Sequence, residues 1–173
     1  MDDFANWVGK AKEVKEKTNI IYTGAILTKE SQNSLFQKVN EIHPISTEWK
    51  CFCHHVTIRF RPKDDTELIV FGDDISLIIT ELFKDEKCIT VRVEPNSNKQ
   101  ELNMPVEQIP HITIATAPGI SPVYSNDLLR KEKGIKMPHM LSVEAFLGAK
   151  LNNGTIVPER SDVALENFTL KYV

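Results

Sequence analysis

The sequence predicts a single domain of the α+β class in which strands outnumber helices. Short apolar stretches that alternate with polar residues and are bounded by turn-forming residues indicate the strands. Longer stretches with apolar residues at helical spacing indicate the helices. The order is strand-helix-strand before residue 72 and strand-loop-helix-strand after residue 88, which indicates two related lobes, each presenting one histidine-bearing strand.

An additional amphipathic helix is predicted within residues 1–18, where apolar side chains recur at helical spacing between lysines and glutamates. The first strand is predicted at residues 19–27, and Gly24 inside it indicates a bulge or a close approach by another segment. Thr28 is then expected to cap a helix that ends near Ile42, at a His-Pro pair.

The first histidine-bearing strand is predicted from about Cys51 to Phe60. Short β segments are expected to follow at residues 67–71, 75–83 and 88–94. The turn at residues 84–87 would join the last two as a hairpin. A helix at 75–83 is the alternative, since a short apolar run does not distinguish a helix from a strand.

The second histidine-bearing strand is predicted at residues 109–116, and the polar, irregular stretch 95–105 before it is expected to be a loop placed to act as a lid. The residues Asn152-Asn153-Gly154 are a strong hairpin signal. The remaining predicted elements are a short helix capped by Ser125 or Asn126, a strand at 141–151, a strand at 155–157 and a last strand at 168–172.

Two of the predicted strands carry the same pattern of a histidine, an apolar residue, a threonine and a second apolar residue. The pattern is found at His55–Ile58 and again at His111–Ile114. Side chains two positions apart in a strand share a face. Each strand is therefore expected to present an imidazole and a hydroxyl on one face and apolar side chains on the other.

Two such strands in a chain of 173 residues resemble the 2H phosphoesterase superfamily, which is named for its two histidines. The resemblance implies a bilobal fold over residues 1–173, with two antiparallel-sheet lobes that each give one His-x-Thr strand to a central groove and with helices on the outside. It also implies a catalytic set of His55, Thr57, His111 and Thr113. The alternative is two buried strands that each happen to carry a histidine.

Three further stretches sharpen the resemblance, namely Tyr22-Thr23-Gly24 ahead of the helix start at Thr28, the doubled histidine within 54–58, and residues 110–113 followed by 122–126. Over about residues 20–150 the chain is similar to the phage anti-CBASS phosphodiesterases, which destroy cyclic oligonucleotide alarm signals. It is also similar to the cyclic phosphodiesterase domain of fungal tRNA ligases.

Three residues are candidates for substrate binding. By the anti-CBASS resemblance, Tyr22 contacts a nucleobase and Glu144 reads a base edge. Tyr124, in the loop after the second histidine-bearing strand, is placed to stack on a base. The alternatives are that both tyrosines only pack against the protein and that Glu144 is a surface charge.

The two histidines match the chemistry that cleavage of a phosphodiester requires. A proton must leave the attacking hydroxyl or water, and another must reach the departing oxygen. Histidine has an unperturbed pKa of about 6.5, so one ring can act as the base while its partner acts as the acid. The threonine hydroxyls can donate to the non-bridging oxygens. This chemistry requires neither a metal nor another cofactor.

The anti-CBASS resemblance implies a metal-independent phosphodiesterase that cleaves cyclic oligonucleotide messengers in immune evasion. This is the favoured function, because the low net charge and short chain favour a small substrate over a folded RNA. The alternative is opening of a 2′,3′-cyclic phosphate at an RNA end, as in RNA repair. Both reactions would use the same four catalytic residues, so the motif does not choose between them. A second alternative is a non-catalytic nucleotide-binding module.

Composition narrows the possible partners. A formal net charge of −3 and a pI near 6.0 argue against binding of extended duplex nucleic acid, which requires many phosphates to be neutralised. No membrane-spanning or signal segment is evident, so a cytoplasmic location is expected, or the host cytosol if the protein is viral. The odd count of 3 cysteines is expected to remain as thiols.

A zinc site is the rival chemical interpretation of the first histidine-bearing strand. Cys51, Cys53 and His55 alternate along it and would share one face of a continuous strand. No distant pair of ligands completes a tetrahedral site, so this interpretation is disfavoured. His54 is expected to alternate onto the core side with Val56 and to be a buried structural histidine.

Overall fold

The computed structural model describes residues 20–60, 72–96 and 108–162. Its elements, in chain order, are β1 (Ile20–Leu27), α2 (Lys29–Ile42), β2 (Lys50–Cys51), β3 (His55–Phe60), β4 (Asp74–Lys84), β5 (Cys88–Pro95), β6 (His111–Thr116), α3 (Tyr124–Lys131), β7 (Ile135–Leu151) and β8 (Ile156–Val157).

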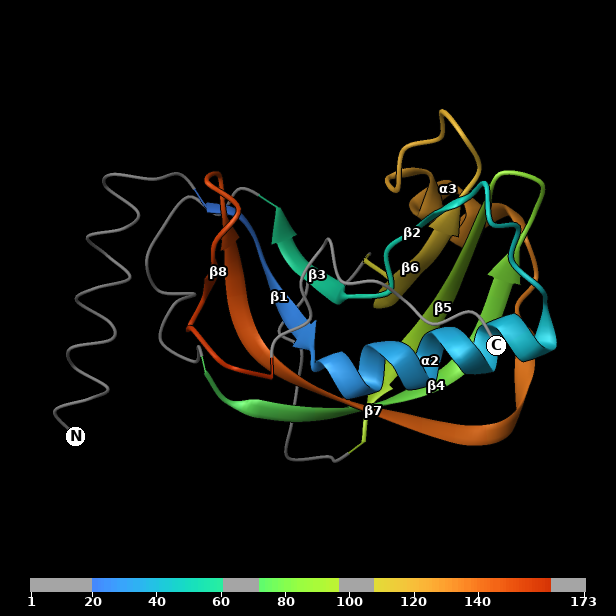
Figure 1. Cartoon of the computed structure of the whole chain (residues 1–173). Coiled ribbons are helices and arrows are strands. Elements are labelled where there is room, and N and C mark those ends of the chain that lie inside the picture. Colours follow the sequence, from blue (N-terminus) through green and yellow to red (C-terminus); the bar gives the residue numbers. More distant parts are fainter. Residues whose placement is uncertain (1–19, 61–71, 97–107, 163–173) are drawn as a thin grey trace, which may run out of the picture.

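The described strands belong to one antiparallel sheet in the order β1-β3-β6-β5-β4-β7-β8, with β2 beside β6. β1 also pairs with β7, so the sheet closes on itself like a barrel (Figure 1). The α+β class is confirmed. The expected division into two separate sheets is not confirmed, because both histidine-bearing strands are part of the same closed sheet.

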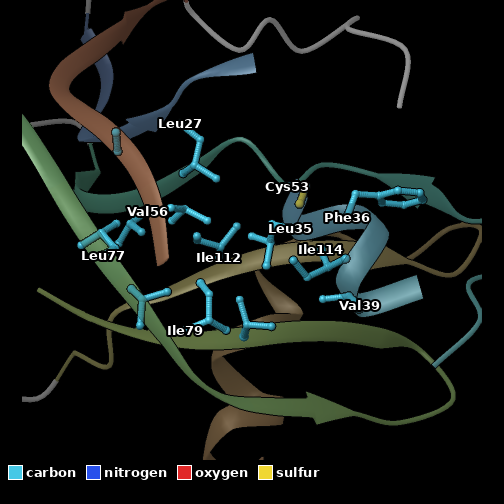
Figure 2. Packing of buried hydrophobic residues seen from close by; sticks show 14 of the residues in the cluster. Leu27, Leu35, Phe36, Val39, Cys53, Val56, Leu77, Ile79, Ile112 and Ile114 are labelled. Carbon is cyan, nitrogen blue, oxygen red and sulfur yellow. The ribbon is translucent and has the colours of Figure 1, made fainter. Parts of the chain in front are cut away.

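One apolar core fills the inner side of this sheet. It combines inward-facing residues of the strands, such as Leu77 and Ile114, with Leu35, Phe36 and Val39 of α2 (Figure 2). α3 packs instead against a second cluster that includes Phe83 and Cys88, which lie on either side of the turn between β4 and β5. α2 therefore completes the core, and α3 lies beside β5.

Several predicted elements are confirmed. The side chain of Thr28 caps α2 by accepting a hydrogen bond from the backbone N–H of Ser31 (3.2 Å). Residues 75–83 form a strand and not a helix, since β4 pairs with both β5 and β7. The turn at 152–154 joins β7 to β8 as expected, although β7 begins at Ile135, earlier than predicted.

The short helix after β6 does not start where the sequence predicts. Its N-cap position is Val123, whose backbone N–H is bonded to the hydroxyl of Ser121 (3.3 Å). Ser125 and Asn126, the predicted caps, lie in the first helical turn, and Ser125 is fully buried. The hydroxyl of Ser125 is therefore turned toward β6 and does not cap the helix.

Some predictions fall outside the described residues. These are the N-terminal helix, the strand at 67–71, almost all of the loop at 95–105 and the strand at 168–172. Neither of the helices in the described ranges has the length and apolarity needed to cross a membrane.

Gly24 brings β1 close to β3, as its position in the sequence indicated. The pairing of these strands shifts register between Thr23 and Gly24. A Cβ at Gly24 would collide with the backbone carbonyl oxygen of Val56. Only glycine allows β1 to lie this close to the strand that carries His55.

The first histidine-bearing strand is broken, although the sequence predicts it as continuous. Cys53 has φ of 61°, in the left-handed region, and it separates β2 from β3. The backbone N–H of Cys53 is bonded to the carbonyl of Thr113 (2.8 Å). Such a conformation costs a non-glycine residue roughly 1–3 kcal/mol. It also ends the simple alternation of side chains, so residues on either side of Cys53 no longer follow one strand pattern.

Candidate active site

β3 and β6 meet through the pair Val56 and Ile112. Both side chains are fully buried on the core side of the sheet, and Figure 2 shows them within the core cluster. Their neighbours in each strand must therefore point to the opposite face. In an antiparallel pair, the residue before one partner lies opposite the residue after the other, so Thr57 lies across from His111, and His55 from Thr113.

These four residues line a single cleft of about 570 Å³ on the outer face of the barrel. Each of the four is half-buried. The structure thus brings together the two His-x-Thr pairs that the sequence singled out, and it places them around one space. Residues of α3 complete the cleft on the β6 side, and residues of β1 and β7 complete it on the β3 side.

The ring of His55 is held on several sides. It stacks on the ring of Tyr22, with centroids 4.1 Å apart and an interplanar angle of 9°. Its Nε2 lies 3.0 Å from the hydroxyl of Thr57, and its Nδ1 lies 2.5 Å from Nδ1 of His54. Both ring nitrogens of His55 therefore have partners within the site.

His54 does not lie where the sequence predicts. It is buried as expected, with 6% of its surface exposed, but it lines the cleft beside His55 instead of sharing the core side with Val56. The rings of His54 and His55 stack with centroids 4.6 Å apart. Adjacent residues in a regular strand point to opposite faces, but His54 lies in the bend that precedes β3 and so is not bound by this alternation.

His111 and Thr113 have a different set of partners. The Nδ1–H of His111 donates to the backbone carbonyl of Ile109 (2.8 Å), so Nε2 is the nitrogen left for proton transfer. The hydroxyl of Thr113 lies 2.8 Å from the hydroxyl of Ser125, which lies 3.4 Å from the thiol of Cys88. Hence Thr113 is bonded to α3, whereas Thr57 is bonded to its own histidine.

Burial lowers the pKa of His55 and of His111. For His55 the pKa lies well below its usual value, because burial is reinforced by the positive charge of Lys150 and by the charge that His54 and His111 carry when they are protonated. Burial also lowers the pKa of His111, but the hydrogen bond to Ile109 acts in the opposite direction. Both rings are therefore neutral at pH 7 before a substrate binds, and His55 is the harder of the two to protonate.

The rest of the cleft wall combines aromatic and cationic side chains. Tyr22, Phe52 and Phe60 are the aromatic residues, and Phe60 is exposed over 66% of its surface. Arg130 of α3 and Lys150 of β7 are the cations. Of these five, the sequence singled out only Tyr22. Lys150 enters the site because it pairs with Tyr22 across β1 and β7, a long-range pairing that the sequence pattern did not reveal.

Two of the candidate substrate-binding residues do not line the cleft. The hydroxyl of Tyr124 donates to the carboxylate of Asp85, and Lys131 lies 2.9 Å from the same carboxylate. This cluster holds the β4–β5 turn to α3. Glu144 accepts a hydrogen bond from the hydroxyl of Ser76 (3.1 Å) on the neighbouring strand β4. The structure therefore gives both residues partners away from the two histidines.

The zinc interpretation does not match the geometry. Cys53 is fully buried in the apolar core and its thiol donates to the backbone carbonyl of Gln32 (3.7 Å), while His55 faces the cleft. The three residues Cys51, Cys53 and His55 therefore do not share a face. Within the described ranges, no group of three or more His, Cys, Asp or Glu side chains is placed to hold a metal ion.

Comparison with known families agrees with the two-histidine cleft. A model of the fungal tRNA ligase phosphodiesterase domain matches residues 29–158, which include all four cleft residues. The chain belongs to this family. Members of the tRNA ligase phosphodiesterase family are enzymes of the 2H phosphoesterase type, so this protein is a phosphodiesterase.

A solved structure, titled "Crystal Structure of Fungal RNA Kinase", is similar to this chain at 16% sequence identity with a TM-score of 0.44. The similarity covers 74% of this chain and 41% of the solved chain, so this member of the tRNA ligase phosphodiesterase family spans less than half of that structure. No curated protein sequence matches the chain.

Proposed function

We propose that this phosphodiesterase opens 2′,3′-cyclic phosphates at RNA ends, with His55 as the general base and His111 as the general acid. The observation that carries the proposal is the convergence of two imidazoles and two threonine hydroxyls on one cleft, across the contact between Val56 and Ile112. Membership of the tRNA ligase phosphodiesterase family supports an RNA end as the substrate more than a cyclic oligonucleotide.

The roles of the two histidines follow from their surroundings. His55, whose pKa is held lower, is neutral and accepts the proton of the attacking water at Nε2. The negative charge of a bound phosphate favours the protonated form of His111, whose Nε2 then donates a proton to the departing ribose oxygen. The bond between water oxygen and phosphorus forms as the bond to one ribose oxygen breaks, which leaves a phosphomonoester.

The threonine hydroxyls stabilise the charge that develops on phosphorus. Thr57 is bonded to Nε2 of His55 in the unliganded site, so its hydroxyl changes partner when phosphate arrives. It then donates to a non-bridging oxygen and frees Nε2 for the water. Thr113, already bonded to Ser125, donates to the opposite side of the phosphate. Donors aimed in advance at this charge typically contribute about 10²–10³-fold to the rate.

The remaining wall of the cleft suits a nucleotide chain. Phe52 and Phe60 offer aromatic surface on which a base can stack. Arg130 and Lys150 place a positive charge on either side of the histidines, where the phosphates of neighbouring nucleotides would lie. An RNA end with several nucleotides is therefore expected to bind better than a single cyclic nucleotide.

The test is a panel of substrates given to the purified protein. We expect an RNA oligonucleotide ending in a 2′,3′-cyclic phosphate to be converted to a phosphomonoester end faster than cyclic di- or trinucleotides are opened. His55→Ala and His111→Ala should each lower kcat by about 10²–10⁴-fold, the range for general acid-base catalysis. His43→Ala, at the C-cap of α2 and outside the cleft, is the matched control.

Two results would overturn the proposal. Cleavage of a cyclic oligonucleotide with no action on the RNA end would show that the proposed substrate is wrong. Full activity of His55→Ala or of His111→Ala would show that the proposed acid-base mechanism is wrong. Treatment with EDTA should leave the rate unchanged, because the two imidazoles supply both proton transfers. A loss of activity that a divalent metal restores would contradict this mechanism.

A further inference from the structure

His54 and His55 are in direct contact through their ring nitrogens. Their Nδ1 atoms lie 2.5 Å apart, which is close enough that one must donate a proton to the other. A neutral imidazole carries a single N–H, so the nitrogen of His55 that donates to His54 cannot also accept a proton. The partner of Nδ1 therefore determines whether Nε2 of His55 is free to act as a base.

We propose that His54 is a positioning residue: its Nδ1 accepts a hydrogen bond from the Nδ1–H of His55 and so fixes the tautomer in which Nε2 of His55 takes the proton of water. The proposal rests on the function proposed above. His111 offers a direct parallel, since its Nδ1–H donates to the backbone carbonyl of Ile109. In one half of the site a carbonyl orients the imidazole, and in the other half a second imidazole does.

The surroundings of His54 hold its acceptor in place. Its backbone carbonyl accepts a hydrogen bond from the N–H of Leu27 (2.9 Å), and the edge of Phe52 packs on its ring with centroids 6.1 Å apart. The ring is almost completely buried. His54 lies in the bend between Cys53, which has a left-handed backbone conformation, and the start of β3, so it can lie on the same side as His55.

The proton count of the reaction closes with His54 in this role. Water gives a proton to Nε2 of His55 as it bonds to phosphorus, and the departing ribose oxygen takes the proton of His111. His55 is then an imidazolium whose Nδ1–H donates a charge-assisted bond to His54. Release of one proton from His55 to solvent restores the resting enzyme, in which both rings are neutral, and His111 takes up a proton from solvent when the next phosphate binds.

Because the acceptor, His54, is itself an imidazole, the orientation of the base His55 is expected to depend on pH. Protonation of His54 would place a second N–H against Nδ1 of His55 and abolish the orienting bond. The charged and titratable groups that face the pair, among the described residues, are Lys150 on β7, His111 on β6 and Tyr22 on β1. The acidic limb of the rate profile should therefore report the two histidines as one coupled unit.

Two substitutions at position 54 separate orientation from packing. His54→Phe keeps an aromatic ring but removes the acceptor, and it should lower kcat by about 10- to 100-fold, part of what a general base contributes, with KM within about 2-fold. His54→Asn keeps a carbonyl acceptor that does not titrate. It should retain kcat within about 3-fold and move the acidic limb of kcat to lower pH.

Equal losses in both variants, or a wild-type kcat and pH profile in His54→Phe, would overturn the proposal. The second measurement does not depend on activity. Nitrogen-15 NMR of the imidazoles in the wild-type protein, with His54→Asn used for assignment, should find His55 protonated at Nδ1. A proton on Nε2 of His55 in the resting protein would also overturn the proposal. Failure of the wild-type enzyme to open a cyclic phosphate would reject the proposed function without moving this spectrum.

Discussion

The ring of Tyr22 lies face to face with the ring of His55, and only 7% of the surface of Tyr22 is exposed. The sequence places Tyr22 in the site as a contact for a nucleobase. In the structure the imidazole of His55 already stacks on its aromatic face. In the pairing of β1 with β7, the residue opposite Tyr22 is Lys150. Tyr22 therefore forms a wall that fixes the plane of His55, and we expect it to affect rate more than substrate affinity.

Replacement of this ring gives the first prediction. Tyr22→Leu should lower kcat by about 2- to 10-fold, since an aromatic pair contributes about 0.5–1.5 kcal/mol beyond its buried area. Tyr22→Phe keeps the stack and should retain most of kcat. Steady-state kinetics on an RNA cyclic phosphate measure both. A rise in KM with an unchanged kcat in Tyr22→Leu would instead assign the residue to base recognition.

A second prediction concerns the hydroxyl of Thr113. Ser125 lies between it and Cys88, and burial raises the pKa of the Cys88 thiol to about 11, so the thiol stays protonated. A chain in which Cys88 donates to Ser125 and Ser125 to Thr113 turns the Thr113 hydrogen toward the cleft. Ser125→Ala should lower kcat about 2- to 10-fold, the range for one hydrogen bond.

Cys88→Ser is the matched control for this chain, because a hydroxyl can replace the thiol as donor to Ser125. It should retain kcat, whereas Ser125→Ala should not. Circular dichroism checks that both variants fold. Equal activity of the wild type and Ser125→Ala would show that Thr113 needs no help in orienting its hydroxyl.

Much of the site follows from rules that act within a few residues. Period-2 alternation placed each histidine beside its threonine, on the face opposite Val56 and Ile112. The position of Gly24 in an apolar strand indicated the close approach that the structure has. Such features are local, so the sequence carries them without knowledge of the fold.

The remaining features depend on backbone geometry and on long-range pairing. His54 lies beside His55 in a bend where the chain leaves the strand conformation at Cys53, and a cysteine gives no sequence signal for positive φ. Lys150 reaches the cleft through the pairing that closes the barrel between β1 and β7. Tyr124 and Glu144 were assigned by proximity in sequence and by resemblance, and their partners Asp85 and Ser76 come from other strands or turns.

The third prediction follows from the lowered pKa values of His55 and His111. In the unfolded chain both titrate near pH 6.5, so below that pH the unfolded state binds more protons than the native state. Above about pH 6.5 these two histidines therefore do not reduce the free energy of unfolding. As the pH drops from there toward their native pKa values, the free energy of unfolding falls by at most about 1.4 kcal/mol per pH unit for each histidine.

Thermal denaturation between neutral and acidic pH measures this dependence. His55→Asn removes one of the two groups and should flatten the acid dependence of Tm. Burial and the charge of Lys84 lower the pKa of His43 as well. Because the side chain of His43 is more exposed to solvent, His43→Asn should change the acid dependence of Tm less than His55→Asn does. An unchanged acid slope in His55→Asn would mean that its pKa is close to its unfolded value.

The fourth prediction tests whether the spacing of β1 and β3 sets the position of His55. Gly24→Ala introduces a Cβ that collides with the backbone carbonyl oxygen of Val56, which no side-chain rotation can relieve. Overpacking of this kind costs about 1–3 kcal/mol, and a displacement of about 1 Å at a catalytic group can cost 10²-fold in rate. We therefore expect both a lower Tm and a lower kcat.

Gly154→Asn is the control for Gly24→Ala, since Gly154 has φ of 88° and open space around its Cβ position, and asparagine tolerates this conformation. Its backbone strain should lower Tm less than the collision at Gly24 does, and because Gly154 lies in the turn between β7 and β8, kcat should stay unchanged. A Gly24→Ala protein with a lower Tm but an unchanged kcat would show that the collision destabilises the fold without displacing His55 from the substrate. In that case Val56, His55 and the rest of the cleft would have to move together. A protein that keeps both would mean that β1 shifts away from β3 without strain.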